Sequence, residues 1–248
     1  MKKILLGLFA ITSVSAIAAE GINVYGRLGL DIYSRYNNFS YSYNETGNET
    51  GNDYYRVSRA TNPIDPEINS SVKSKGRIAP SIALEITKDL GSNFEAGIGL
   101  GYVWHRRRSY EENGINSDGV RYHGNGKIPA INSVPLYVTG KYKFNTNSNV
   151  KPYIKADLGY SFNRMKSSFD VNGVDQYGGT YTTKYEGLKA KNGLYTAVGF
   201  GAEYNNVTID LSYVFTGAKV RISDEEGTNS FRANNSAIRL TVGYKFSF

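Results

Sequence analysis

The fold is decided by the stretch at the C-terminal end, Leu240-Thr241-Val242-Gly243-Tyr244-Lys245-Phe246-Ser247-Phe248. Large apolar side chains occupy every second position, and small or polar residues lie between them. A period of two is typical of a β-strand with one apolar face, because successive side chains point to opposite sides. The stretch therefore predicts a strand that separates an apolar environment from a polar one.

Seven further segments show the same alternation. They cover residues 22–36, 76–88, 93–107, 134–144, 150–164, 191–204 and 207–220, and the last strand extends back to 235. Each is long enough for the 9–11 tilted residues of a membrane-spanning strand. Short turns follow the second, fourth and sixth segments, whereas the other links are long and cover 37–75, 108–133, 165–190 and 221–234. Short turns at one end and long loops at the other are typical of an outer-membrane barrel, whose long loops are extracellular.

Alternation alone leaves open whether the apolar face fills a soluble barrel or meets lipid. Aromatic residues of that face gather near both ends of the strands, with aliphatic residues between them, and this sorting by depth favours lipid. The opposite face mixes both signs of charge with glycine, which suits a narrow, filled interior. The expected interior charge network consists of Arg27, Asp31, Glu85, Glu95, Lys141, Lys155, Asp157, Glu203, Asp210 and Arg239. We predict that these charges pair, Arg27 or Arg239 with Glu85, Glu95 or Asp31, and that side chains plug the lumen.

The outward-facing positions beyond the upper aromatic residues are basic. They are Arg106, Arg164, Lys219, Arg221 and Arg232. A cation costs little near the membrane interface. One hypothesis is a collar that binds the phosphates of lipopolysaccharide; the alternative is that wet strand ends tolerate any charge.

Taken together, the chain resembles the small eight-stranded outer-membrane barrels, which include opacity-type adhesins and the membrane domain of OmpA-like proteins. The specific motif is the last strand: Leu240, Val242, Tyr244, Phe246 and Phe248 match the signal read by the barrel assembly machinery in this family. The resemblance implies an all-β, antiparallel, up-and-down transmembrane β-barrel with four long extracellular loops and three short periplasmic turns. It also implies assembly by that machinery into the bacterial outer membrane, and we expect a monomer.

The N-terminal residues are expected to be removed. Lys2 and Lys3 precede an apolar run that ends in the small-x-small pattern Ala16-Ile17-Ala18, which is typical of a secretory signal peptide. We expect a signal peptide at 1–19, cleaved after Ala18 or Ala19, and one barrel domain at 20–248. The sequence contains no cysteine, so no disulfide framework is available.

The sequence shows no constellation of catalytic, cofactor-binding or metal-binding residues. His105 and His123 are its two histidines, and no Gly-x-Ser-x-Gly elbow occurs. We therefore expect no enzyme, no cofactor and no nucleic-acid partner. The link 37–75 is rich in Tyr, Ser, Asn and Gly, a composition that suits binding loops, although a solvated loop under little constraint is the alternative. We expect any surface ligand to contact the links 37–75 and 108–133. They favour an adhesin-like surface role, with a host or cell-surface ligand, together with envelope integrity. The alternatives are a narrow porin-like channel for small solutes and a surface lipid-modifying enzyme.

Overall fold

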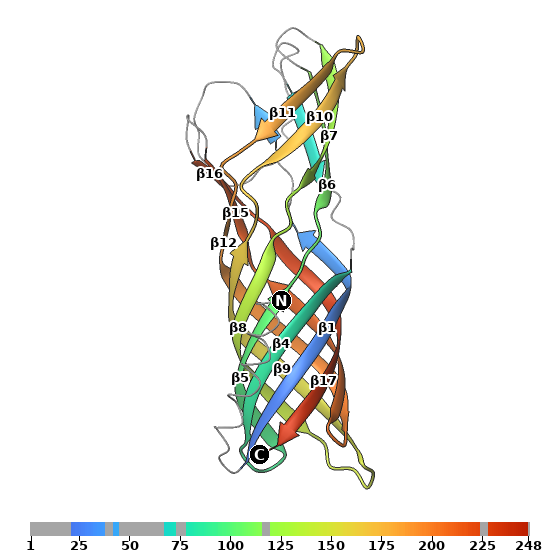
Figure 1. Cartoon of the computed structure of the whole chain (residues 1–248), viewed down its shortest axis with the longest axis vertical. Coiled ribbons are helices and arrows are strands. Elements are labelled where there is room, and N and C mark those ends of the chain that lie inside the picture. Colours follow the sequence, from blue (N-terminus) through green and yellow to red (C-terminus); the bar gives the residue numbers. More distant parts are fainter. Residues whose placement is uncertain are drawn as a thin grey trace, which may run out of the picture.

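The computed structural model describes residues 21–37, 42–44, 67–72, 78–115, 120–223 and 228–247. The expected signal peptide, Phe248 and much of the link 37–75 lie outside these ranges. All elements that the structure describes are β-strands (Figure 1). Within the same ranges, no helix has the length and apolar character needed to cross a membrane.

Eight strands close a barrel in the order β1-β17-β14-β13-β9-β8-β5-β4. They are β1 (Ile22–Asn37), β4 (Ala79–Asp89), β5 (Phe94–Val103), β8 (Asn132–Lys143), β9 (Val150–Arg164), β13 (Gly193–Tyr204), β14 (Val207–Thr216) and β17 (Asn234–Ser247). All neighbours are antiparallel, and β1 pairs with both β4 and β17, which closes the ring. Each of the eight predicted segments overlaps one of these strands, and the predicted all-β barrel class is confirmed; β5 ends at Val103 and β14 at Thr216, earlier than predicted.

The short turns have the backbone conformations that their residues favour. The β13–β14 hairpin pairs Tyr204 with Val207, and Asn205 between them has a φ of 53°. Asn tolerates this left-handed region better than most residues. The β4–β5 turn uses Gly91 at a φ of 82°. Both turns lie at the end of the barrel where β17 finishes, the lower end in Figure 1.

The apolar face of each ladder points outward. Leu28 is 66% exposed and Leu158 is 56% exposed, whereas Arg27 and Asp157 are buried inside. This arrangement is the reverse of a soluble barrel core and matches a surface that hydrocarbon covers. The predicted orientation of the two faces is therefore confirmed.

One part of β1 departs from the predicted alternation. Strict alternation along the predicted segment 22–36 would place Tyr33 and Arg35 on the inner face with Asp31, but both are exposed, and Ser34 is buried instead. The register with β17 shifts between Asp31 and Tyr33, so Ile32 is the extra residue of a β-bulge. A bulge inverts the facing of every residue beyond it, and that part of the prediction was wrong.

The four long links are only partly loops, because they contain strands that build two further sheets. One sheet has six strands in the order β11-β10-β7-β6-β3-β2, and the other has the order β12-β15-β16. Their strands are β2 (Ser42–Asn44), β3 (Glu67–Val72), β6 (Arg108–Ile115), β7 (Arg121–Ile128), β10 (Phe169–Asp175), β11 (Thr180–Tyr185), β12 (Lys189–Lys191), β15 (Lys219–Ser223) and β16 (Thr228–Arg232). Figure 1 shows the six-stranded sheet rising beyond the barrel at the end opposite the short turns.

A small apolar cluster lies at the same end of the barrel. Its buried members are Ile131, Leu188, Ala218, Val220 and Ala233, and Met165, Phe169 and Ala190 pack against them. Ile131, Met165 and Ala233 directly precede or follow a barrel strand, and Val220 and Ala190 come from the three-stranded sheet. The cluster therefore anchors that sheet to the extracellular rim.

Candidate functional site: a charged lumen and an extracellular surface

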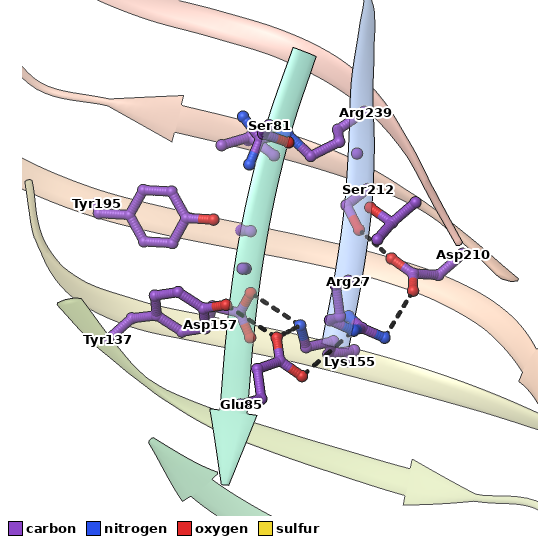
Figure 2. A pocket seen from close by; sticks show the side chains of 15 residues that line it. Arg27, Ser81, Glu85, Tyr137, Lys155, Asp157, Tyr195, Asp210, Ser212 and Arg239 are labelled. Carbon is purple, nitrogen blue, oxygen red and sulfur yellow. Dashed lines mark hydrogen bonds and ion pairs between the residues drawn. The ribbon is translucent and has the colours of Figure 1, made fainter. Parts of the chain in front are cut away.

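The middle of the lumen is organised around Arg27. This arginine on β1 lies between two carboxylates from other strands: its Nη2 is 2.8 Å from Asp210 Oδ2, and its Nε is 3.4 Å from Glu85 Oε2. Lys155 on β9 adds a second cation, with Nζ 2.5 Å from Glu85 Oε1 and 3.3 Å from Asp157 Oδ2. Figure 2 shows these side chains converging from strands on opposite sides of the barrel.

Glycines on the inner face make room for tyrosine rings in this layer. A Cβ on Gly99 would lie 2.4 Å from the Tyr137 ring, so the ring can cross the lumen only beside glycine. Tyr137 then donates its hydroxyl to Glu85 Oε1 at 2.9 Å. Tyr153 likewise donates to Asp210 Oδ2 at 3.0 Å. Charges and glycines on one strand face therefore form a packed lumen.

A second cluster closes the periplasmic part of the lumen. Lys143 bridges two carboxylates, with Nζ 2.9 Å from Glu95 Oε2 and 3.2 Å from Glu203 Oε2. Lys141 Nζ is 3.8 Å from Glu95 Oε1 and 3.8 Å from the centre of the Tyr25 ring, a cation–π distance. The predicted network omitted Lys143 and Lys245, which also pair with lumen carboxylates. The alternation could have indicated both, because they occupy inward-facing positions of their strands.

The third layer lies toward the extracellular end. Arg239 Nε is 2.5 Å from Asp31 Oδ1, and its Nη2 is 3.2 Å from Asp31 Oδ2, which is a bidentate pair. All ten residues of the predicted network thus face the lumen, and the predicted pairings of Arg27 with Glu85 and Arg239 with Asp31 occur.

Above these charges, polar side chains join several strands at the rim. Arg108 donates to Ser34 Oγ at 3.1 Å, and Ser34 donates to Asn235 Oδ1 at 3.1 Å. Asn235 Nδ2 lies 2.6 Å from His105 Nε2, so the imidazole accepts this bond in its neutral form. Burial lowers the pKa of His105 to about 4, which keeps the ring neutral near pH 7.

The middle of the lumen holds little free space. The cavity among Arg27, Glu85, Tyr137, Lys155 and Arg239 has a volume of about 30 Å³. A cavity needs at least about 10–15 Å³ to hold one water, so there is room for only a few. Cations and carboxylates are present in equal numbers among the ion-paired lumen residues: Arg27, Lys141, Lys143, Lys155, Lys245 and Arg239 against Asp31, Glu85, Glu95, Asp157, Glu203 and Asp210.

Aromatic side chains on the outer face form two rings around the barrel, one near each end, and aliphatic side chains lie in the band between these aromatic rings. Tyr160 and Phe162 make a T-shaped contact near the extracellular end, and Tyr142 and Phe144 make another at the periplasmic end. The described residues of the proposed assembly signal also face outward, namely Leu240, Val242, Tyr244 and Phe246. A closed barrel with such a surface is an outer-membrane β-barrel.

Four of the five residues of the hypothetical collar lie on neighbouring elements, and Arg106 lies apart from them. Lys219 and Arg221 on β15 and Arg232 on β16 are exposed on the three-stranded sheet. Arg164 is exposed at the end of β9. Arg106 follows β5. Around the barrel, the strands β13, β9 and β8 lie between β5 and β14, the strand that leads into β15.

The two histidines have different surroundings. His123 on β7 is exposed, and its Nδ1 lies 2.7 Å from Asn113 Oδ1. His105 belongs to the rim network. Across the described ranges, no three His, Cys, Asp or Glu side chains come together in a way that could hold a metal ion.

The chain is 31% identical over 262 residues to the uncharacterized protein PM1543 of Pasteurella multocida (strain Pm70), an alignment that spans 99% of this chain and 98% of that protein. The chain belongs to the family of this protein. No family model matches it. Two solved structures with similar shape are the outer membrane protein OprG from Pseudomonas aeruginosa and the outer membrane protein AlkL in lipid bilayers. OprG is 14% identical with a TM-score of 0.45, over 93% of this chain and 98% of OprG. AlkL is 15% identical with a TM-score of 0.45, over 93% of this chain and 92% of AlkL.

Proposed function

We propose that this protein is a non-enzymatic, monomeric outer-membrane barrel that supports envelope integrity and presents an extracellular binding surface. The observation that carries the proposal is the six-stranded sheet beyond the barrel (Figure 1). Its strands come from three different links, so the sheet ties these links into one scaffold. Assembly through the last strand by the barrel assembly machinery is part of the same proposal.

The sheet presents a structured tip. Strands β6 and β7 pair along their whole length, from Arg108 opposite Ile128 to Ile115 opposite Arg121. At the tip of the β10–β11 hairpin, Asp175 Oδ1 accepts hydrogen bonds from the backbone N–H groups of Tyr177 and Gly179, both at 2.8 Å. The turn leaves Tyr177 79% exposed. A tyrosine on a fixed turn offers contact area at a low entropic cost, which suits recognition of a ligand.

The lumen supports this proposal over the porin-like alternative. Ion-paired side chains lie at three levels of the lumen, and the cavity of about 30 Å³ at the middle level has room for only a few waters. Conductance across a planar bilayer separates the two functions. We expect no steady ohmic openings from the wild-type barrel, whereas regular openings would favour the channel.

The lipid-modifying alternative has less support. A cleft of about 470 Å³ at the rim includes His105, but its other polar residues are Tyr102, Arg107, Asn132, Arg164 and Lys166. This lining contains no serine, threonine, cysteine or carboxylate that a histidine base could activate. The substitutions His105→Gln and His123→Gln should leave the structure of lipid A in whole cells unchanged, as mass spectrometry can measure.

The binding proposal is tested with the tip residues. Cells that display the wild-type barrel are applied to immobilised host glycoproteins and glycans, beside cells that display Tyr177→Ser with Val174→Ser. We expect the variant to lose binding and to keep the heat-modifiable migration of a folded barrel. The control is Asn206→Ser in a periplasmic turn. If wild-type cells bind none of these surfaces, the adhesin role is abandoned and the structural role remains.

A further inference from the structure

The three-stranded sheet at the rim has two very different faces. One face is apolar: Val220 and Ala190 pack into the rim cluster, and Val220 is fully buried. The opposite face is exposed and carries five basic side chains, which are Lys189, Lys191, Lys219, Arg221 and Arg232. The described residues of these strands include no Asp or Glu.

The register places these cations directly opposite one another. Lys189 is paired with Arg221, Lys191 with Lys219, and Lys219 with Arg232. Like charges at directly opposite positions destabilise a sheet. In the lumen, by contrast, the cations of the network each have a carboxylate partner. Within the described part of the chain, none of the five basic residues of this face makes an ion pair; the acids Asp224, Glu225 and Glu226, which follow β15 in the sequence, lie outside it.

The position of this face points to the membrane surface. Tyr213 and Phe215 on β14 belong to the upper aromatic ring, and Lys219 follows Phe215 by four residues. Four residues at about 3.3 Å each, on a strand tilted by about 40°, rise about 10 Å. Headgroups extend roughly 5–8 Å beyond the hydrocarbon on each side, so the backbone at Lys219 lies at the outer edge of the headgroup region, where a long cationic side chain can reach lipid phosphates.

We propose that this face, Lys189, Lys191, Lys219, Arg221 and Arg232, is a binding site for a phosphorylated glycolipid of the outer leaflet. Phosphate monoesters carry a charge of about −1.5 to −2 each, so two of them on one lipid balance most of the five cations. Lysine and arginine form short, charge-assisted hydrogen bonds with phosphate oxygens. Arg164 at the end of β9, which packs beside β12, extends the site on one flank. The inference rests on the proposed membrane placement and is independent of the binding tip at Tyr177.

The test uses the purified full-length barrel in detergent, titrated with bisphosphorylated lipid A and followed by native mass spectrometry. We expect Lys219→Gln with Arg221→Gln to weaken binding about 25-fold, which is roughly fivefold for each cation removed near an anionic lipid. Dephosphorylated lipid A should bind the wild type and this variant equally weakly. The matched control is Lys88→Gln with Lys151→Gln, which removes the same charge from exposed positions at the periplasmic end and should bind like the wild type.

Several outcomes would overturn the proposal. Equal affinity of wild type and variant for bisphosphorylated lipid A would do so, as would equal affinity of the wild type for the dephosphorylated lipid. Binding of a soluble sulfated polysaccharide in place of the lipid would assign the face to a soluble polyanion instead. If the first variant fails to fold, Lys189→Gln with Lys191→Gln removes two cations from the neighbouring strand. The Tyr177→Ser variant should keep full lipid binding, so failure of the surface-ligand proposal leaves this test intact.

Discussion

Replacing Arg27 by Met should destabilise the barrel strongly, because it leaves a buried carboxylate without a cation. Arg27 neutralises both Glu85 and Asp210. Glu85 keeps Lys155 at 2.5 Å, but among the described residues Asp210 keeps only neutral partners, the Tyr153 hydroxyl at 3.0 Å and the Ser212 hydroxyl at 3.2 Å. Removing one partner of a buried pair costs about 3–5 kcal/mol. We expect a loss in this range, and it should come from Asp210 rather than from Glu85.

A second substitution tests that assignment. Asp210→Asn in the Arg27→Met background removes the uncompensated charge and keeps the side-chain volume. It should recover about half of the lost stability or more, so the two substitutions have a large coupling energy. Lys88→Met at an exposed periplasmic position is the matched control, and its effect should stay within about 0.5 kcal/mol.

Urea unfolding of the barrel in lipid vesicles measures these differences. Trp104, the single tryptophan, lies exposed at the upper aromatic ring and reports on contact with lipid. Electrophoretic migration without boiling reports barrel closure independently. A loss below about 1 kcal/mol for Arg27→Met would refute the reasoning, and so would a double variant no more stable than Arg27→Met alone.

Three further predictions concern packing, pH and conductance. A Cβ on Gly159 would lie 2.1 Å from the carbonyl oxygen of Leu136, so Gly159→Ala should cost about 3 kcal/mol or prevent folding; Gly26→Ala meets nothing within 4 Å and should fold normally, as heat modifiability can show. The pKa of His105 is about 4 in the folded state and about 6.5 in the unfolded state. Between pH 6.5 and pH 4, therefore, the imidazole is protonated mainly in the unfolded state. Stability should therefore fall by on the order of 1–3 kcal/mol as the pH drops from 6.5 to 4, and His105→Gln should abolish that part of the slope in urea titrations. The wild-type barrel should stay silent in planar bilayers, and charge-selective openings would contradict the filled lumen.

Strict alternation made the barrel predictable from sequence. In a strand with lipid on one face and charged lumen side chains on the other, the alternation of side chains alone decides which face each residue takes. Arg27 and Leu28 illustrate this, because neighbours in sequence lie on opposite sides of the wall. The turn at Asn205 was equally readable, since its residue type matches its backbone conformation.

Alternation does not predict which face a residue takes after an inserted residue, or in a strand with solvent on both faces. The bulge at Ile32 has no signal of its own, because Ile32 and Tyr33 can both face lipid. Strands β6 and β7 carry polar residues on both faces, so period two is invisible there and the extracellular sheet could not be predicted. Lys189 and Lys191 were missed because β12 has only three residues, and its place opposite β15 follows from tertiary pairing.

The contrast between paired and exposed cations explains how one small barrel can separate stability from recognition. Inside, every cation of the network faces a carboxylate, so the charges fix the strands against one another. The cavity in the middle of the lumen has space for only a few waters. The proposed recognition is therefore assigned to the outside, above the lipid. The cations without carboxylate partners in the described sheet β12-β15-β16 and the projecting tip at Tyr177 lie there, on elements whose removal would leave the eight-stranded wall closed.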